Sequence, residues 1–391
     1  MYTFISAGVS ARLSHAMSSI NRNLTRPIDN SQHSVALKRN TYMALLFSPL
    51  SLREITLQNR IVVAPMSQYA ASSGLPSAHH HSHYKALAAS GAALIVIEST
   101  AVTLQGCNTP HCLGLWNDAQ EAGFASLVTA IKAESQVKVG LQLSHAGRKA
   151  AVTWVNGTER PLPSEENWEI CGPSPISFAP NWPIPTALTA SDMNTIKEAF
   201  ALSATRAHRA GIDVLELHCA HGYLLHQFLS PISNQRTDEY GGSLANRMRF
   251  PLEVIGSVRD GWPGSKPLGL RVSCTEWSEA PEFSLEEVCA FVSIAKQQGV
   301  DFVCASSGGN DWKAEIPESP GFQLPFAETI RRNTGVVVRG VGKIVTGQQA
   351  ETALQEGKAD LIAIARAILQ DANWVLQAAA ALQVPFPPSP Y

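Results

Sequence analysis

The chain has 391 residues, of which 45% are hydrophobic and 16% charged, and its formal net charge is −2 at pH 7. A nearly neutral chain has no strong field for nucleic acid or for an anionic membrane, so we expect neither partner. No apolar run approaches the ~18–20 residues of a membrane-spanning helix, so the sequence predicts a soluble globular protein. The seven cysteines are an odd number and are scattered, which argues against a disulfide framework.

Residues 1–44 differ in composition from the rest of the chain. They contain one acidic residue, Asp29, among many serines and asparagines. Their basic residues are Arg12, Arg22, Arg26, Lys38 and Arg39. An arginine-rich, acid-poor N-terminus is typical of mitochondrial or plastid transit peptides. We favour the alternative, a disordered leader without an address, and therefore expect a cytoplasmic protein with one folded domain at 45–391.

From residue 45 the chain alternates between short β-branched runs and helical patterns. Apolar runs of this length predict parallel strands that are buried on both faces. The predicted strands are 61–66, 93–99, 138–144, 214–218, 268–273, 302–306, 336–340 and 361–365. The predicted helices are 84–89, 121–134, 192–210, 246–260, 284–298, 326–332, 347–356 and 374–382.

Eight strand–helix repeats over ~340 residues indicate an α/β fold, a single-domain (β/α)8 TIM barrel. An open doubly wound sheet usually carries Gly-x-Gly-x-x-Gly after its first strand, a turn that residues 64–69 (Ala-Pro-Met-Ser-Gln-Tyr) do not match.

Several residues have the character of helix caps. Asp192 and Ser284 are predicted N-caps, and Glu287 is predicted to complete a capping box with Ser284. Gly211 and Gly299 stand where helices are expected to end.

The connection after the third predicted strand, residues 149–185, is too long for a plain loop. It holds Trp154, Trp168 and Trp182, seven prolines and no clear period. Long irregular segments of this kind are usually lids or binding loops. An insertion that only fills the rim of the barrel is the equally open alternative.

The fourth predicted strand ends in an unusual group of side chains. Residues 215–223 read Leu-Glu-Leu-His-Cys-Ala-His-Gly-Tyr, so His218, His221 and Tyr223 follow one another at the strand end. Chemistry in a TIM barrel is found at the carboxyl ends of the strands. Two imidazoles and a phenol there can hold a carbonyl oxygen and deliver a proton beside it.

The other predicted strand ends also carry polar groups or glycines, and those of strands 7 and 8 combine glycine with arginine, as phosphate sites of such barrels do. In chain order they are 65–69, 98–100, Gln142 with 144–149, Arg271, 306–309, 340–343 and 365–366.

Two patterns suggest a metal site only weakly. The run from His79 to His83 resembles a metal-binding tract, but no carboxylate or cysteine accompanies it. Cys107 and Cys112 could form a metal pair, but no second pair follows at zinc spacing. We therefore expect no metal.

With these motifs, the chain resembles the Old Yellow Enzyme family of FMN-dependent ene-reductases, and within it the bacterial-type, "thermophilic-like" subclass. The resemblance covers about residues 45–390. It rests on the strand-4 motif, on Gln-Leu-Ser-His-Ala-Gly-Arg-Lys at 142–149, and on residues 228–247, which include Ser-Asn-Gln-Arg-Thr-Asp-Glu-Tyr-Gly-Gly-Ser.

The resemblance implies roles for individual residues. His218 and His221 match the pair that binds the activating oxygen of the substrate, Tyr223 the proton donor, and Tyr69 an aromatic of the substrate pocket. The implied cofactor-binding residues are Pro65, Met66, Ser67, Ser99, Gln142, Lys149, Arg271, Gly309, Gly342, Ala365 and Arg366. Gln142 and Arg271 match contacts to the flavin pyrimidine edge, and Gly342 and Arg366 match phosphate contacts.

The implied reaction transfers hydride from NADPH or NADH, through N5 of FMN, to the β-carbon of an activated alkene such as an α,β-unsaturated carbonyl or nitro compound. Tyr223 would then protonate the α-carbon. The resemblance also makes a homodimer possible. A flavin-dependent redox isomerase or desaturase, and a flavin-binding protein without catalysis, are the alternative functions.

Three positions depart from the pattern of the subclass. Ser67 stands where a cysteine is usual, as a substrate contact that is also expected to tune the flavin, and a hydroxyl lacks the ionisable thiol. Ala365 replaces a glycine before Arg366. The tail at 385–391, Pro-Phe-Pro-Pro-Ser-Pro-Tyr, lacks the arginine that reaches a neighbouring subunit.

Overall fold

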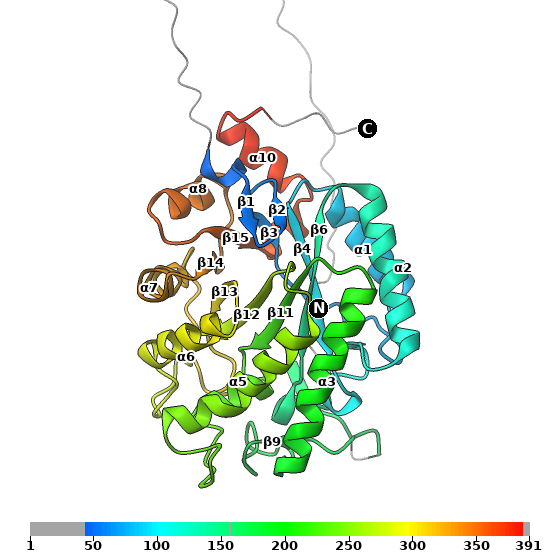
Figure 1. Ribbon diagram of the computed structural model, residues 1–391, viewed down its shortest axis with the longest axis vertical. Helices are drawn as coiled ribbons and strands as arrows, with labels where there is room; N and C mark the ends of the chain where they lie inside the picture. The colour runs from blue at the N-terminus through cyan, green and yellow to red at the C-terminus, as the bar shows by residue number, and fades with distance from the viewer. Residues whose placement is uncertain (1–43, 156–157, 164, 386–391) are drawn as a thin grey trace, which may run out of the picture.

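The computed structural model describes residues 44–155, 158–163 and 165–385. Nearly all of the leader at 1–44, with its two interpretations, and nearly all of the tail at 385–391 lie outside these residues. Within them, a cylinder of parallel strands is surrounded by helices (Figure 1). No helix in the described ranges is long and apolar enough to cross a membrane.

The predicted barrel is confirmed. Each strand pairs in parallel with the next, and the last pairs with the first, which closes the sheet. The barrel strands are β3 (Ile61–Val63), β4 (Leu94–Ala101), β6 (Lys138–Ser144), β11 (Val214–Cys219), β12 (Leu268–Ser273), β13 (Phe302–Ser306), β14 (Val337–Gly340) and β15 (Leu361–Ile364). A short strand, β5 (Leu113–Gly114), extends the sheet beside β4. β3 ends before Pro65, which has no amide hydrogen for the ladder.

The helices follow the predicted order with shifted ends. They are α1 (Ala78–Ala88), α2 (Asp118–Glu134), α3 (Ala190–Arg209), α5 (Leu244–Gly261), α6 (Leu285–Gln297), α7 (Leu324–Thr334), α8 (Gly347–Gln355) and α10 (Trp374–Ala381). α1 begins six residues before the expected start at 84. Two short helices were not predicted from the sequence: α4 (Leu224–Leu229), which follows the turn after β11, and α9 (Arg366–Gln370), which begins just after β15.

The predicted cap at Asp192 is wrong. Thr189 is the N-cap of α3, its hydroxyl accepts from the amide of Asp192, and the Asp192 carboxylate bonds back to Thr189. Ser284 does cap α6. Glu287 does not complete a box with it, because its carboxylate accepts from Arg247 at 2.6 Å, an ion pair to the neighbouring helix α5.

A hairpin that the sequence analysis did not predict closes the amino-terminal end of the barrel. It consists of β1 (Leu50–Leu52) and β2 (Ile55–Leu57), which pair antiparallel. Leu52 and Leu57 are buried against the first residues of several barrel strands, among them Val214 and Phe302. The hairpin therefore fills the end of the barrel opposite the polar strand ends.

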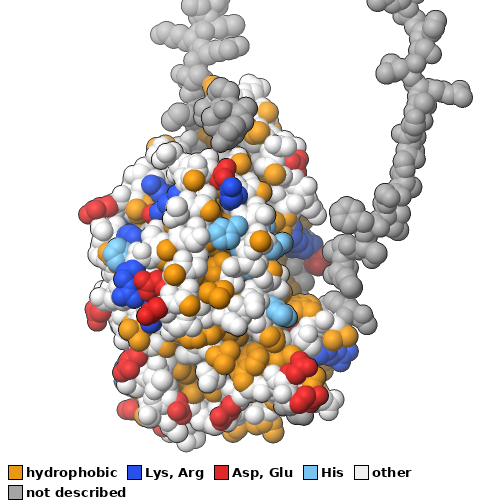
Figure 2. Space-filling model, turned by 90° about the vertical axis from the view of Figure 1, so that its right-hand side faces the viewer, with side chains coloured by type: hydrophobic (Ala, Val, Ile, Leu, Met, Phe, Trp, Pro, Cys, Tyr) orange, Lys and Arg blue, Asp and Glu red, His pale blue; other side chains and the backbone are white. Residues whose placement is uncertain are grey.

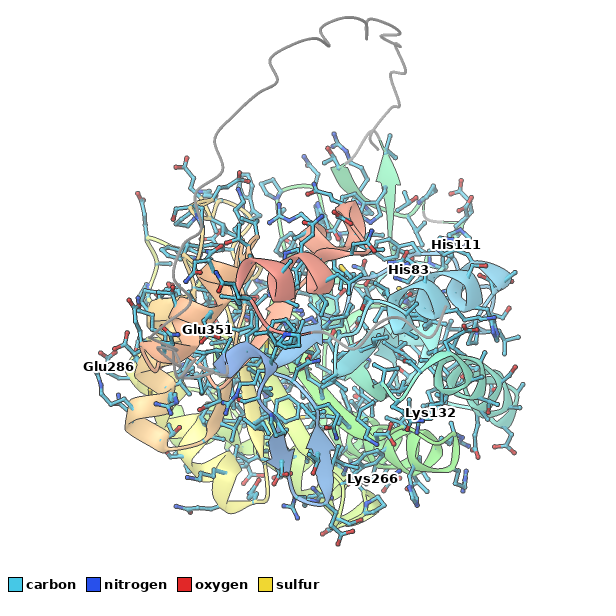
Figure 3. The ribbon with its side chains drawn as sticks, turned by 90° about the horizontal axis from the view of Figure 1, so that it is seen from above. His83, His111, Lys132, Lys266, Glu286 and Glu351 are labelled. Atoms are coloured by element: carbon cyan, nitrogen blue, oxygen red, sulfur yellow. The ribbon has the colours of Figure 1, made fainter. Side chains whose placement is uncertain are left out.

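Charged side chains outside the barrel form hydrogen bonds to backbone groups of other elements. Glu351 of α8 accepts from the amides of Leu45 and Leu46 in the short helix η1 (Leu45–Phe47), beside which it lies in Figure 3. Lys132 and Lys266, labelled in the same view, donate to the carbonyls of Gly211 and Ile212 at 2.8 and 2.6 Å. Because these carbonyls follow α3, the two lysines stabilise the end of that helix and the turn into β11.

The long insertion after β6 contains ordered strands. β7 (Val152–Val155) and β8 (Thr158–Pro161) pair antiparallel, and β9 (Cys171–Gly172) pairs in parallel with β10 (Thr186–Ala187). The insertion begins after the short helix η3 (Gly147–Lys149).

Apolar side chains gather on the lower half of the face in Figure 2. Two leucines on the outside of the barrel, Leu104 and Leu202, are 53% and 57% exposed. With Trp116 they line a hollow of about 270 Å³ between α3 and the loop after β4, which contains the short helix η2 (Leu104–Gly106).

Candidate active site

The turn after β11 combines two backbone conformations that are rare for side-chain-bearing residues. His221 has φ +57° and Gly222 has φ +73°. A left-handed conformation at a non-glycine residue is unfavourable and persists only where its surroundings fix it. A Cβ on Gly222 would lie 2.3 Å from the carbonyl oxygen of Gly309, so only glycine fits there. This strained turn places His221 and Tyr223 on either side of one glycine.

Buried side chains hold the backbone of this turn from several directions. The amide of His221 donates to Ser273 at 2.9 Å, and that of Gly222 donates to Nδ1 of His226 at 3.0 Å. The Gln227 side chain donates to the carbonyl of Gly222 at 2.6 Å. His226 and Gln227 belong to α4, so the missed helix is part of the support for the site. The contacts of His226 and Gln227 were not predicted, because the sequence around them is rich in leucine.

The structure brings His218 and His221 together. Nε2 of His218 lies 3.3 Å from Nδ1 of His221, and the rings are perpendicular with centroids 5.0 Å apart. Burial, followed by the charge of Arg271, lowers the pKa of both imidazoles well below the ordinary value. Both rings are therefore neutral at physiological pH and can act as hydrogen-bond donors rather than as cations.

Tyr223 stacks on His218, with ring centroids 4.6 Å apart and an angle of 29° between the planes. Burial is the main cause that raises the pKa of Tyr223 well above 10, and a hydrogen bond to Ser99 lowers it. Tyr69 lies nearby, and burial raises its pKa to about 12. Both phenols therefore keep their protons at physiological pH.

The loop after β3 carries the predicted flavin wall. Pro65 and Met66 are half-buried and Ser67 is exposed. The buried carboxylate of Glu98 accepts from the amide of Gln68 at 3.0 Å and fixes this loop. The same carboxylate contacts Nε2 of His80, a member of the histidine run.

The histidine run therefore has structural contacts. His79 bonds to the Gln68 side chain at 3.0 Å, which in turn donates to the carbonyl of Met66. His83 stacks on His79, and burial lowers its pKa to about 4. These histidines tie α1 to the loop after β3.

The two thiols that were considered as a metal pair, Cys107 and Cys112, are buried. Burial raises the pKa of both, which favours the protonated thiol over the thiolate that binds metals. Across the described residues there is no group of three or more His, Cys, Asp or Glu side chains arranged to hold a metal ion.

Gln142 is oriented by a buried ion pair inside the barrel. Its Nε2 donates to Glu216 at 2.7 Å, and Glu216 also pairs with Arg339. Because this bond fixes which end of the amide is the nitrogen, it also fixes the position of the amide oxygen, which can accept from a ring N–H. Burial lowers the pKa of Arg339 to about 9, and its guanidinium lies over the ring of Phe302. The sequence analysis found Gln142 but neither Glu216 nor Arg339 in this role.

At the ends of β14 and β15, Gly342 is buried with φ +122°, Ala365 is half-buried, and Arg366 is exposed at the start of α9. Lys343 pairs with Glu318 at 2.6 Å, and the charge of Arg366 also lowers the pKa of that carboxylate. Two cations and a glycine backbone therefore meet here, as a phosphate site requires.

Lys149 connects two strand ends. Its ammonium donates to the carbonyls of His221 and Gly309 at 3.2 and 3.0 Å and lies 4.6 Å from the ring centre of Phe178. Its neighbour Arg148 donates to Asn310 at 2.8 Å. Both basic residues of the motif at 142–149 therefore hold the loop after β13 in place.

The insertion after β6 reaches the same region. Trp154 of β7 lies against Tyr69, with ring centroids 6.1 Å apart, and Trp168 donates to the carbonyl of Gln105. Of the two interpretations, these contacts favour a binding loop over an insertion that only fills the rim.

The carboxyl end of the barrel has the groups that FMN needs. Ser99 and Arg271 are partly exposed although their strands are otherwise buried, and Gly309 in the loop after β13 is also partly exposed, so solvent reaches this end of the barrel. Nε of Arg271 is buried without a hydrogen-bond partner, which suits an arginine facing the flavin pyrimidine edge. Gly309, with φ +92°, and Gly342, with φ +122°, adopt conformations that favour glycine, and a Cβ there would lie against His221 or Gln323.

A surface hollow at the other end lacks such groups. It measures about 760 Å³ and is lined by Arg53, Arg259 and Trp262 among others. Both guanidiniums are already paired: Arg53 bonds to Asp301 at 2.7 Å, and Arg259 bonds to two backbone carbonyls. The candidate site therefore lies at the carboxyl end.

Comparisons with known proteins agree with a flavin-binding barrel. The model of the NADH:flavin oxidoreductase / NADH oxidase family matches residues 45–384. An NADPH dehydrogenase of Geobacillus thermodenitrificans is 42% identical over 342 residues, covering 87% of this chain and 95% of that protein. Morphinone reductase has a TM-score of 0.72 at 26% identity, covering 88% and 91%. A structure of morphinone reductase in complex with tetrahydroNAD has a TM-score of 0.69, at 26% identity and coverages of 88% and 92%.

The fold and the strand-end groups define a TIM-barrel oxidoreductase. The chain belongs to the NADH:flavin oxidoreductase / NADH oxidase family, the family of the Old Yellow Enzymes, and its cofactor is FMN with a nicotinamide as reductant. The predicted family, fold and cofactors are confirmed. The roles of individual site residues stay predictions.

Proposed function

We propose that this flavoprotein reduces activated C=C bonds, with NADPH as the reductant and α,β-unsaturated carbonyl or nitro compounds as substrates. The observation that carries the proposal is the neutral pair His218 and His221, with facing nitrogens 3.3 Å apart and Tyr223 stacked on one of them. Such a group can bind an oxygen and protonate a neighbouring carbon without moving the backbone.

The histidine pair holds the activating oxygen of the substrate. As the alkene is reduced, negative charge develops on that oxygen, so N–H donors bind it more tightly in the transition state than in the ground state. A donor of this kind typically lowers the activation barrier by about 3–4 kcal/mol. Neutral rings serve this purpose because their positions, fixed by burial, need no rearrangement during the reaction.

Tyr223 supplies the proton to the α-carbon. Its raised pKa keeps the phenol protonated over the whole neutral range. The hydroxyl of Ser99 lies next to the phenol and bonds to Ser144 at 2.6 Å. The serine pair can stabilise the charge that remains on the phenol oxygen after proton transfer.

The remaining predicted residues would hold FMN. Gln142 and Arg271 would hold the pyrimidine edge, Pro65, Met66, Ser67 and Ser99 would form the walls, and the strand-7 and strand-8 residues would bind the phosphate. FMN, when bound, supplies the hydride that it has accepted from the nicotinamide. The positive charge of Arg271 would favour the reduced, anionic flavin. Tyr69 and Trp154 form the opposite wall of the substrate pocket.

NADPH is proposed over NADH because relatives of this chain at about 40% identity, including the Geobacillus protein, are NADPH dehydrogenases. The homodimer stays a prediction that sedimentation of the purified protein would decide. Small activated alkenes are proposed as substrates because the histidine pair and Tyr223 can bind an activating oxygen and protonate the neighbouring carbon.

The experiment is anaerobic stopped-flow absorbance of the purified holoenzyme. We expect NADPH to bleach the flavin faster than NADH, and 2-cyclohexenone to restore the colour with formation of cyclohexanone. Rapid bleaching without reoxidation by enones or nitroalkenes would remove the ene-reductase proposal and leave only the family assignment. Slow bleaching by either nicotinamide, together with bleaching by a saturated substrate and reoxidation by oxygen, would favour a desaturase.

A further inference from the structure

A backbone hydrogen bond fixes the tautomer of His218. Its Nδ1 accepts the amide hydrogen of Ala220 at 3.2 Å. An amide can only donate, so the ring proton of the neutral imidazole lies on Nε2. His218 therefore always presents an N–H toward His221 and toward the position of the substrate oxygen.

The ring nitrogens of His221 face side chains, and no backbone amide of the described residues fixes its tautomer. Its Nδ1 faces Nε2 of His218 at 3.3 Å, and its Nε2 faces the hydroxyl of Ser306 at 2.7 Å. A hydroxyl can donate or accept, so Ser306 is compatible with either tautomer of His221. When Nδ1 accepts from His218, Nε2 donates to Ser306. When Nδ1 is to donate to a substrate oxygen, Nε2 must accept from Ser306.

The hydroxyl hydrogen of Ser306 has two acceptors within reach. Gln323 donates through Nε2 to the carbonyl of Val341 at 3.2 Å, which turns its Oε1 toward the serines. That oxygen accepts from Ser307 at 2.7 Å and lies 3.5 Å from Ser306. The hydrogen of Ser306 can therefore rotate between Gln323 and the much closer Nε2 of His221.

We propose that Ser306 is a positioning residue that lets His221 change tautomer when a carbonyl oxygen binds. In the free protein, His221 accepts at Nδ1 from His218 and the Ser306 hydrogen is directed at Gln323. In the complex, Ser306 donates to Nε2, and the proton of His221 resides on Nδ1, beside the N–H of His218. The ring is neutral in both states: Nε2 gives up one proton to solvent and Nδ1 takes one up from it, and His221 is partly exposed.

The inference rests on the proposed function, in which both histidines donate to the substrate oxygen. Without the change of tautomer, only His218 could donate, and the substrate oxygen would accept one hydrogen bond instead of two. Burial of Ser306, which is 2% exposed, keeps water from replacing its hydroxyl. A buried ring nitrogen without a partner is costly, so Ser306 decides which tautomer is available.

The test uses the FMN-loaded protein with ¹⁵N-labelled histidine, in which NMR shifts of the ring nitrogens report the tautomer directly. Cyclohexanone is the probe, because it offers a carbonyl oxygen and no double bond to reduce. The signals of His221 are assigned by their absence from His221→Gln. His218 serves as an internal reference because its tautomer is fixed.

In the wild-type protein we expect the proton of His221 to lie on Nε2 without ligand and on Nδ1 with saturating cyclohexanone. Ser306→Ala should suppress this change and weaken cyclohexanone binding by about tenfold, the effect of one hydrogen bond. Ser306→Thr keeps the hydroxyl and should restore both. Ser273→Ala is the matched control: Ser273 pairs with Ser306 in the β12–β13 register but bonds to the backbone of His221, so the change of tautomer should persist.

A His221 proton on the same nitrogen with and without the ketone in the wild-type protein would overturn the inference. An unaltered change of tautomer and unaltered affinity in Ser306→Ala would overturn it as well. Neither result depends on turnover of 2-cyclohexenone. Loss of the proposed function is recognised separately, by the failure of enones to reoxidise the flavin.

Discussion

At its amino-terminal end the barrel is closed by Leu52 and Leu57, which pack on the first residues of the strands. Polar groups at that end are satisfied, as in the ion pair of Arg53 with Asp301. At the carboxyl end, His221 adopts a left-handed conformation and Arg271 Nε is buried without a partner. The difference shows how one fold separates its tasks: apolar burial stabilises one end, and an unsatisfied buried polar atom is retained at the end that is proposed to bind ligands.

The largest effect is expected from the carboxyl end. Tyr223→Phe removes the proposed acid and should slow reoxidation of the reduced flavin by 2-cyclohexenone by about 10²–10⁴-fold, the usual contribution of a general acid. Bleaching by NADPH, which requires no proton from Tyr223, should be nearly unchanged. Single-turnover stopped-flow measurements separate the two steps. Equal rates of reoxidation in variant and wild type would remove Tyr223 from the mechanism.

The matching change at the amino-terminal end should affect stability alone. Leu57→Ala leaves a cavity where the hairpin packs on the strands and should lower the free energy of unfolding by about 2–5 kcal/mol. Because Leu57 lies at the opposite end of the barrel from the strand ends that are proposed to hold FMN, the rates of both half-reactions should not change. Urea unfolding and stopped-flow measurements on the same sample test both statements. A slowed half-reaction in folded protein would show that the two ends are coupled.

The pH dependence of stability should also arise at the carboxyl end. Burial lowers the pKa of His145 to about 4 and that of His226 to about 3, and both rings accept backbone amides. The unfolded chain, with ordinary histidine pKa values near 6.5, binds more protons than the folded protein below that pH. Stability should therefore fall as the pH decreases from about 6.5 to about 4.

Urea unfolding at several pH values measures this slope. His226→Asn provides the comparison, because its amide oxygen can still accept from Gly222 but does not titrate in this range. The variant should show a shallower slope. The same slope in both proteins would assign the pH dependence to other groups.

The smallest effect is expected from Ser67, on the exposed side of the flavin wall. Ser67→Cys introduces the thiol that is usual in the subclass and should shift the midpoint potential of the flavin without changing protein stability. Spectroelectrochemical titration of both proteins measures the shift. An identical potential in both proteins would rule out a tuning role for this position.

Much of the site could be predicted from the strand ends. The parallel arrangement aligns the carboxyl ends of all strands, so His218, Gln142 and Arg271 had to meet once the barrel was recognised. The N-cap of α3 was misplaced at Asp192 because the threonine and the aspartate bond to each other, and either side chain matches a cap pattern. The histidine run was ambiguous for a related reason, since its contacts with Glu98 and Gln68 come from other elements.

The sequence by itself determined the barrel, the family and the identity of the residues at the strand ends, because these depend on local periodicity and on motifs along the chain. Only the tertiary structure decided how those residues are oriented. Gln142 is turned by Glu216, 74 positions away, and the ring of His221 meets Ser306, 85 positions away. Which atom donates and which accepts depends on such distant partners, and no local pattern of residues records them.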